Sequence, residues 1–181
     1  MENILLQPVS LVREVLSISK KWEWAHELWG FKVLKCFPDS CCKLSCQILA
    51  YYLSENSIVP QAEITFIVNA TRQWNGCKWI SGNMFESNVQ SHAWLRIKNW
   101  EVDITADQFN DQTRKIIIEK KSKWHRTFKS YDVCQYPEGM SFNEVFENDF
   151  HIFYRKAFLS NNNLRENRLL FSHRKKVTSN K

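Results

Sequence analysis

Cys42 is the residue of this sequence best placed to act as a nucleophile. It follows the turn-forming run Pro38-Asp39-Ser40, and the apolar positions after it recur at helical spacing, which predicts a helix starting near Cys42. A thiol in a first helical turn lies among backbone N–H groups that have no helical partner, at the positive end of the helix dipole. This environment favours the thiolate, and the same N–H groups could stabilise an oxyanion.

His92 is the candidate general base for this thiol. It lies in a stretch, 91–97, that alternates and is rich in strand-forming residues, and we expect it to open that strand. A second strand is expected over 100–105. Lys98-Asn99 between them is expected to turn the chain, so the sequence predicts an antiparallel hairpin.

This hairpin would bring Asp103 close to His92. With the turn at Lys98-Asn99, His92 opposes Thr105, and Asp103 shares the face of Thr105 because strand side chains alternate. The carboxylate could then hold the imidazole in one tautomer, which is the third role in a nucleophile, base and orienting arrangement. Asp107 competes with Asp103 for this role.

Together these residues resemble the transglutaminase-like branch of the papain-like cysteine enzymes, in which Cys, His and Asp follow in this order along the chain. The family's His-x-Trp and Asp-x-Thr elements correspond to His92-Ala93-Trp94 and Asp103-Ile104-Thr105. The family also has a glycine two positions before the nucleophile and a small residue four positions after it, where this chain has Ser40 and Cys46. The resemblance covers residues 36–109.

The resemblance implies an α+β fold with a papain-like or transglutaminase-like core, in which helices pack on an antiparallel sheet. It implies Cys42 as nucleophile, His92 as base, Asp103 as orienting carboxylate, and no cofactor. Because the family glycine is missing, Cys41 stays an alternative nucleophile. The family includes peptidases, amidases, deamidases, acyltransferases and cross-linking enzymes. We therefore expect a hydrolase or acyl transferase that forms a thioester on Cys42 from a protein or peptide substrate.

Two other readings compete with a cysteine enzyme. A catalytically silent protein could keep the fold and bind a partner through an aromatic cleft, since the chain has 8 Trp and 12 Phe, or through its basic C-terminus. A zinc site would use several cysteines and His92, but their spacing fits no common structural zinc motif, so no metal is expected. The candidate zinc ligands are Cys36, Cys41, Cys42, Cys46 and His92.

Length and charge predict one domain with a basic tail. A chain of 181 residues with only 4 Gly and 4 Pro is expected to form a single domain over 1–160. Its net charge of +6 is concentrated at the end, because 165–181 holds six basic residues and one acidic residue. We expect 161–181 to be a flexible tail and expect no nucleic-acid binding, since the body has no basic stripe. The oligomeric state stays open.

The sequence also bears on where the chain works. No segment approaches the length of a membrane span, and the first residues do not read as a secretion signal. We expect synthesis in the cytoplasm with reduced thiols, and export by a specialised secretion system stays open.

The remaining chain is expected to supply helices, strands and one long connection. The segment from Asn69 to Gln90 is predicted to be irregular and is a candidate substrate lip before His92. His125 is a candidate for the border of the cleft. Further helices are expected at 8–19, 20–29 and 141–158, and further strands at 64–68, 115–119 and 124–133.

Overall fold

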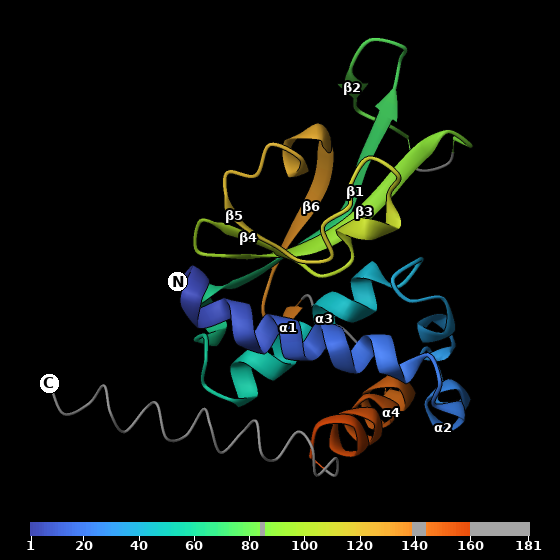
Figure 1. The fold of residues 1–181 in the computed structure, drawn as a ribbon, viewed down its shortest axis with the longest axis vertical. Coiled ribbons are helices and arrows are strands. Elements are labelled where there is room, and N and C mark those ends of the chain that lie inside the picture. The colour runs from blue at the N-terminus through green and yellow to red at the C-terminus, as the bar shows by residue number, and fades with distance from the viewer. Residues whose placement is uncertain (84–85, 139–143, 160–181) are drawn as a thin grey trace, which may run out of the picture.

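The computed structural model describes residues 1–83, 86–138 and 144–159. In this part of the chain the helices gather on one side and an antiparallel sheet lies on the other (Figure 1). The fold is therefore α+β, with helices packed against an antiparallel sheet as predicted. The predicted basic tail at 161–181 lies outside the described residues.

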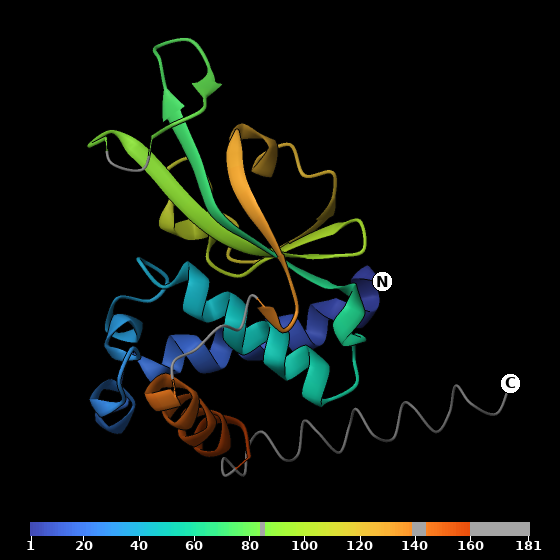
Figure 2. The same cartoon turned by 180° about the vertical axis from the view of Figure 1, so that it is seen from behind.

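The helical side is built mainly from α1, α3 and α4. From behind, α3 crosses in front of α1 below the sheet, and α4 lies below them (Figure 2). A π-helical turn, Arg155–Leu159, continues α4. The α-helices are α1 (Glu2–Ser19), α2 (Glu23–Glu27), α3 (Cys42–Glu55) and α4 (Glu144–Tyr154).

The first helix is longer than predicted. The sequence placed Pro8 in the first turn, but α1 begins at Glu2 and contains Pro8 in its interior. Proline costs a helix one hydrogen bond and strains the preceding turn. Leu5 and Val9 are fully buried on either side of Pro8, so burial of this face against the core outweighs that cost. The predicted end at Ser19 is correct.

The sheet has the strand order β2-β1-β3-β4-β5, and β6 also pairs with β1. All of these pairings are antiparallel. The strands are β1 (Ile64–Trp74), β2 (Trp79–Ile80), β3 (Val89–Ile97), β4 (Trp100–Asp103), β5 (Ile117–Lys120) and β6 (Ser130–Gln135).

The connection predicted to be irregular from Asn69 to Gln90 is strand at both ends and at Trp79–Ile80, and irregular in its other described residues. β1 continues to Trp74, β2 follows, and β3 begins at Val89. The polar end of β1 is held because β3 and β6 pair with it on its two edges, which satisfies its backbone groups. His92 consequently lies inside β3, where it pairs with Ala70, and does not open the strand as predicted.

Other predicted elements also differ in their bounds, among them the strands predicted at 100–105 and 115–119, which are Trp100–Asp103 and Ile117–Lys120. Only Glu23–Glu27 is helical in the stretch predicted as a second helix. The stretch expected to be a strand from Trp124 to Val133 instead starts with a 3₁₀ turn at His125–Thr127, and β6 follows. Of the helix predicted from Ser141, residues 141–143 lie outside the described part of the chain.

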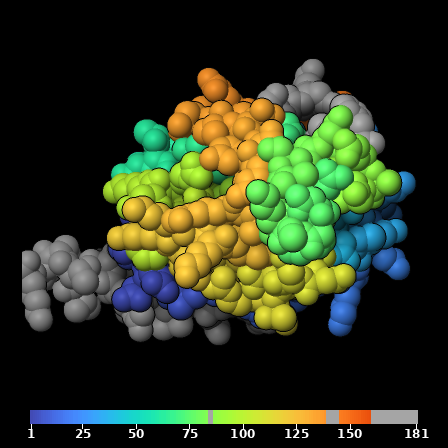
Figure 3. Space-filling model, turned by 90° about the horizontal axis from the view of Figure 1, so that it is seen from above, coloured from blue at the N-terminus to red at the C-terminus, as the bar shows by residue number. Residues whose placement is uncertain are grey.

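The two faces of β3 contribute to two different clusters. Ala93, Leu95 and Ile97 belong to the main core, which includes buried residues of α1, α3 and α4. Trp94 belongs to a second cluster on the opposite face, with Ile67, Ala70, Phe109 and Phe128. Because strand side chains alternate, His92 projects from the same face as Trp94. Seen from above, this side of the molecule is covered by the β1–β2 hairpin (green), the segment between β4 and β6 (yellow to gold) and the β6 segment (orange) (Figure 3).

Candidate functional site

Cys42 is the first residue of α3, as the sequence predicts. The turn before it places Ser40 in the left-handed region, with φ of 59°. Glycine adopts this conformation without steric cost, which gives a physical reason for the glycine that the resembled family has at this position. No side chain caps the N-terminus of α3, and the Cys42 side chain is half-buried, so the thiol stands beside unpaired helical N–H groups.

The hairpin that carries His92 and Asp103 has the predicted register. Ile97 pairs with Trp100 and Leu95 with Val102, so the chain turns at Lys98-Asn99. Lys98 has φ of 56°, which is typical of a tight hairpin turn. The alternation of β3 and β4 then directs His92 and Asp103 to the same face.

His92 and Asp103 form a buried hydrogen-bonded pair. The ring Nε2 of His92 donates to Oδ2 of Asp103 at 2.6 Å, and their side chains are 0% and 1% exposed. The other carboxylate oxygen, Oδ1, accepts from the backbone N–H of Thr105 at 2.8 Å and from its hydroxyl at 3.2 Å. These bonds hold the carboxylate in one direction, and the carboxylate in turn fixes which ring nitrogen of His92 carries a proton toward it.

Cys42 lies against the same imidazole. A hydrogen bond with the Cys42 side chain and its charge both act on His92. Nε2 of His92 is committed to Asp103, which leaves Nδ1, beside the Gln108 amide, as the ring nitrogen available to the thiol. A thiol, an imidazole and a carboxylate are therefore in contact in series.

The electrostatics of the pair favour the charged forms. Burial by itself lowers the pKa of His92, but the charge of Asp103 and the hydrogen bonds to Asp103 and Cys42 outweigh burial and raise this pKa from 6.5 to about 9. Burial by itself raises the pKa of Asp103, yet the charge of His92 and hydrogen bonds from His125 and His92 hold it well below its usual range. An imidazolium beside a carboxylate is thus the stable state at neutral pH.

The neighbouring cysteines do not share this environment. Cys41 is 2% exposed and its thiol donates to the carbonyl oxygen of Pro38 at 3.1 Å. Burial raises the pKa of Cys41 to about 12, and burial also raises the pKa of Cys46 well above its usual value. A buried, neutral thiol is a poor nucleophile, so the geometry favours Cys42 over the alternative Cys41.

Asp107 is engaged elsewhere. Its two carboxylate oxygens accept from the guanidinium of Arg13 at 2.8 and 2.6 Å, and Arg13 also donates to the carbonyl oxygen of Ile104. This contact ties α1 to the chain just after β4. Of the two candidate carboxylates, Asp103 is the one in contact with His92.

Two residues join the site that the sequence did not assign to it. His125 was considered only for the border of the cleft, but its Nε2 donates to Oδ2 of Asp103 at 3.1 Å, and the residue is 3% exposed. The side-chain amide of Gln108 lies 3.2 Å from Nδ1 of His92 and donates to the carbonyl oxygen of Thr105 at 3.0 Å. Neither residue carries a local sequence signal beyond its closeness to Trp124 or to Asp103.

Aromatic rings enclose the imidazole of His92. The ring of Phe109 meets it edge-on with centroids 5.0 Å apart, and those of Trp124 and Phe128 lie 5.6 Å away. Trp94 lies 5.8 Å away on the same strand face. This surrounding lowers the local dielectric and strengthens the His92–Asp103 interaction.

The same residues are the strongest metal candidate in the described part of the chain. Ligand atoms of His92, Asp103 and His125 lie within 4.8 Å of one another. All three side chains are buried, and both imidazoles already donate to one carboxylate oxygen. This set suits a closed hydrogen-bond network better than a catalytic metal centre, which needs an open coordination position. The cysteines considered as zinc ligands do not join the group.

Comparisons with protein-family models, with curated proteins and with solved structures give no match. In the described part of the chain, no helix combines the length and the apolar character that crossing a bilayer requires.

Proposed function

We propose that this chain is a cysteine-dependent hydrolase or acyl transferase with a papain-like or transglutaminase-like core. The observation that carries the proposal is the buried 2.6 Å hydrogen bond between His92 and Asp103, on a ring that also bonds Cys42 at the start of α3. A nucleophile, a base and an orienting group in contact are the features by which such catalytic arrangements are recognised on any fold.

The first half of the reaction forms a thioester. The Cys42 thiolate attacks the carbonyl carbon of an amide or acyl group, and the carbonyl π electrons move to the oxygen. Backbone N–H groups at the start of α3 stabilise that oxyanion. The oxyanion then collapses, the bond to the leaving group breaks, and the His92 imidazolium gives its proton to the departing amine. Asp103 keeps the ring oriented throughout.

The second half regenerates the thiol group. His92, now neutral, accepts a proton from water or from an acceptor amine as that molecule attacks the thioester carbonyl. The carbon–sulfur bond breaks and Cys42 leaves as a thiolate beside the reprotonated ring. Water as the acceptor gives hydrolysis or, on a glutamine side chain, deamidation, and an amine gives acyl transfer. A protein or peptide substrate fits this chemistry.

Alkylation with iodoacetamide at about pH 6 tests the proposal, because only a thiol with a stabilised thiolate reacts quickly there. We expect Cys42 to react at least about tenfold faster than the exposed Cys36 and Cys77. Cys42→Ala should abolish the fast phase and turnover of p-nitrophenyl acetate with no change in the circular dichroism spectrum.

Cys41→Ala is the matched control and should keep both activities. If Cys41→Ala is the inactive variant, the nucleophile has been placed wrongly. If Cys42 labels no faster than the exposed thiols and no acyl-enzyme forms, the chain is instead a silent binding protein with the same core.

A further inference from the structure

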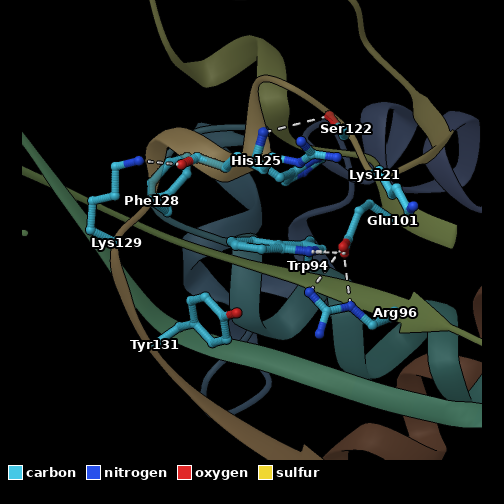
Figure 4. Close-up of a pocket in the computed structure, with 10 residues that line it drawn as sticks. Trp94, Arg96, Glu101, Lys121, Ser122, His125, Phe128, Lys129 and Tyr131 are labelled. Carbon is cyan, nitrogen blue, oxygen red and sulfur yellow. Dashed lines mark hydrogen bonds and ion pairs between the residues drawn. The ribbon is translucent and has the colours of Figure 1, made fainter. Parts of the chain in front are cut away.

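A second candidate site lies beside the catalytic candidates, on the same face of the sheet. A cavity of about 370 Å³ is bounded by β3, β4, the 3₁₀ turn at His125–Thr127 and β6 (Figure 4). Its volume falls in the range of small-ligand sites, which is about 300–1,000 Å³. Trp94, His125 and Phe128 line it, and each is at most 3% exposed, so the inner wall is buried and largely aromatic.

The charge around this cavity is strongly one-sided. Its single carboxylate, Glu101, is already bound, since it accepts from the indole N–H of Trp94 at 2.5 Å and from the guanidinium of Arg96 at 2.9 Å. Three more cations line the cavity, namely Lys121, Arg126 and Lys129, and all three are exposed. No ion pair joins any of these three to a carboxylate within the described residues.

His125 contributes a ring nitrogen that makes no hydrogen bond within the described residues. Its Nε2 is committed to Asp103, whereas its buried Nδ1 has no hydrogen-bond partner among the described residues. A buried polar atom without a partner costs free energy, so such atoms point to a missing partner. This nitrogen lies within the wall of the cavity, since it is inaccessible to solvent although other atoms of His125 line the cavity.

The chemistry of the lining identifies the ligand class. Arginine and lysine together match the geometry and charge of a phosphate group. The half-exposed ring of Tyr131 offers a face to a planar group in the same cavity. We propose that this cavity binds a small phosphate-bearing molecule with a planar ring, such as a nucleoside monophosphate, with Lys121, Arg126 and Lys129 around the phosphate.

Isothermal titration calorimetry with AMP tests this proposal directly, and it does so independently of any activity of Cys42. Inorganic phosphate and adenosine serve as separate ligands that isolate the two halves of AMP. We expect AMP to bind more tightly than about 1 mM, with phosphate weaker and adenosine weakest, and the affinity to fall as salt is added. Adenosine binding as tightly as AMP would contradict the assignment of a phosphate subsite.

Two variants and one control locate the site. Arg126→Ala and Lys121→Ala should each weaken AMP at least about tenfold, because each removes a charge-assisted contact. Lys20→Ala removes the same unit of charge from the exposed end of α1 and should leave the affinity within about twofold. Thermal melting of each variant confirms that it is folded. No AMP binding to the wild type, or equal losses in Lys20→Ala and Arg126→Ala, would overturn the proposal.

Discussion

The two faces of β3 have the same backbone but opposite chemistry. On one face, Ala93, Leu95 and Ile97 are apolar and pack into the core that the helices share. On the other face, His92 and Trp94 are also almost fully buried, yet both make polar contacts, to Asp103 and Glu101. Burial alone therefore does not distinguish a structural face from a candidate functional one.

The difference lies in what burial costs on each face. Apolar side chains gain free energy when they leave water, so the helix-facing side stabilises the fold without further conditions. Buried charged groups lose hydration and are tolerated only with partners, and the Asp103 carboxylate accordingly receives hydrogen bonds from His92, His125 and Thr105. Groups with perturbed pKa values are concentrated at functional sites, which makes this face the candidate functional one.

The largest expected effect is on turnover when the polar face is altered at Asp103. Asp103→Asn keeps the shape but lets the ring settle in the wrong tautomer, and we expect p-nitrophenyl acetate turnover to fall by about 10⁴-fold. Asp107→Asn is the matched control. Because Asp107 contacts Arg13 and not His92, its loss of turnover should stay within about tenfold. If Asp107→Asn loses most of its turnover while Asp103→Asn keeps the turnover of the wild type, the orienting carboxylate is Asp107.

A substitution on the apolar face should lower the stability of the fold and leave the reactivity of Cys42 unchanged. Leu95 is fully buried among the helices, and Leu95→Ala removes that burial and leaves a cavity, which should lower the free energy of unfolding by about 3 kcal/mol. Urea unfolding followed by tryptophan fluorescence measures this loss. Under native conditions the labelling rate of Cys42 should not change. If Leu95→Ala leaves the urea midpoint unchanged, or lowers the labelling rate of Cys42, the two faces of β3 do not have separate roles in stability and reactivity.

The polar face should nevertheless make a pH-dependent contribution to stability. The folded pKa of His92 is raised from 6.5 to about 9, so its contribution is fully present below pH 6.5 and is lost as the pH rises through 9. Asp103 affects stability in acid, because its pKa is lowered in the folded protein. Its contribution to stability is present above pH 3.8 and is lost as the pH falls below that value. We expect the wild type to lose about 3 kcal/mol between pH 6 and 9.

His92→Gln provides the reference for this measurement, since it cannot form the ion pair. Urea unfolding of both proteins at the two pH values gives the difference that belongs to His92. Equal losses in His92→Gln and the wild type would show that other groups cause the pH dependence.

The smallest expected effect concerns the turn that carries Cys42. Ser40 holds a left-handed conformation, with φ of 59°, that costs a residue with a side chain about 1 kcal/mol. Ser40→Gly removes this strain and should raise the free energy of unfolding by up to about 1 kcal/mol, while Cys42 keeps its fast labelling. Ser57, at φ of 52° just after α3, offers a control away from the site and should gain a similar amount as Ser57→Gly. A destabilised Ser40→Gly would mean that the serine side chain itself supports the turn.

Sequence reasoning was reliable where the local chain decides geometry. The start of α3 at Cys42 follows from turn residues and helical periodicity, and the register of β3 and β4 follows from the two-residue turn at Lys98-Asn99. Given that register, alternation is enough to place Asp103 on the face of His92. Local patterns were less reliable after Val68. There β1 continues through polar residues that are typical of a loop, because it pairs with β3 and β6.

The sequence by itself determined a cysteine at a helix start, a histidine in a strand and a carboxylate on the same face of the neighbouring strand. Only the tertiary structure decided that Cys42 meets the His92 ring while Cys41 is buried, that Asp107 belongs to Arg13, and that His125 shares Asp103. These outcomes depend on how α1 and the turn before β6 pack against the sheet. Side-chain directions in turns are not set by helical or strand periodicity, so contacts between distant segments become known only when the chain is folded.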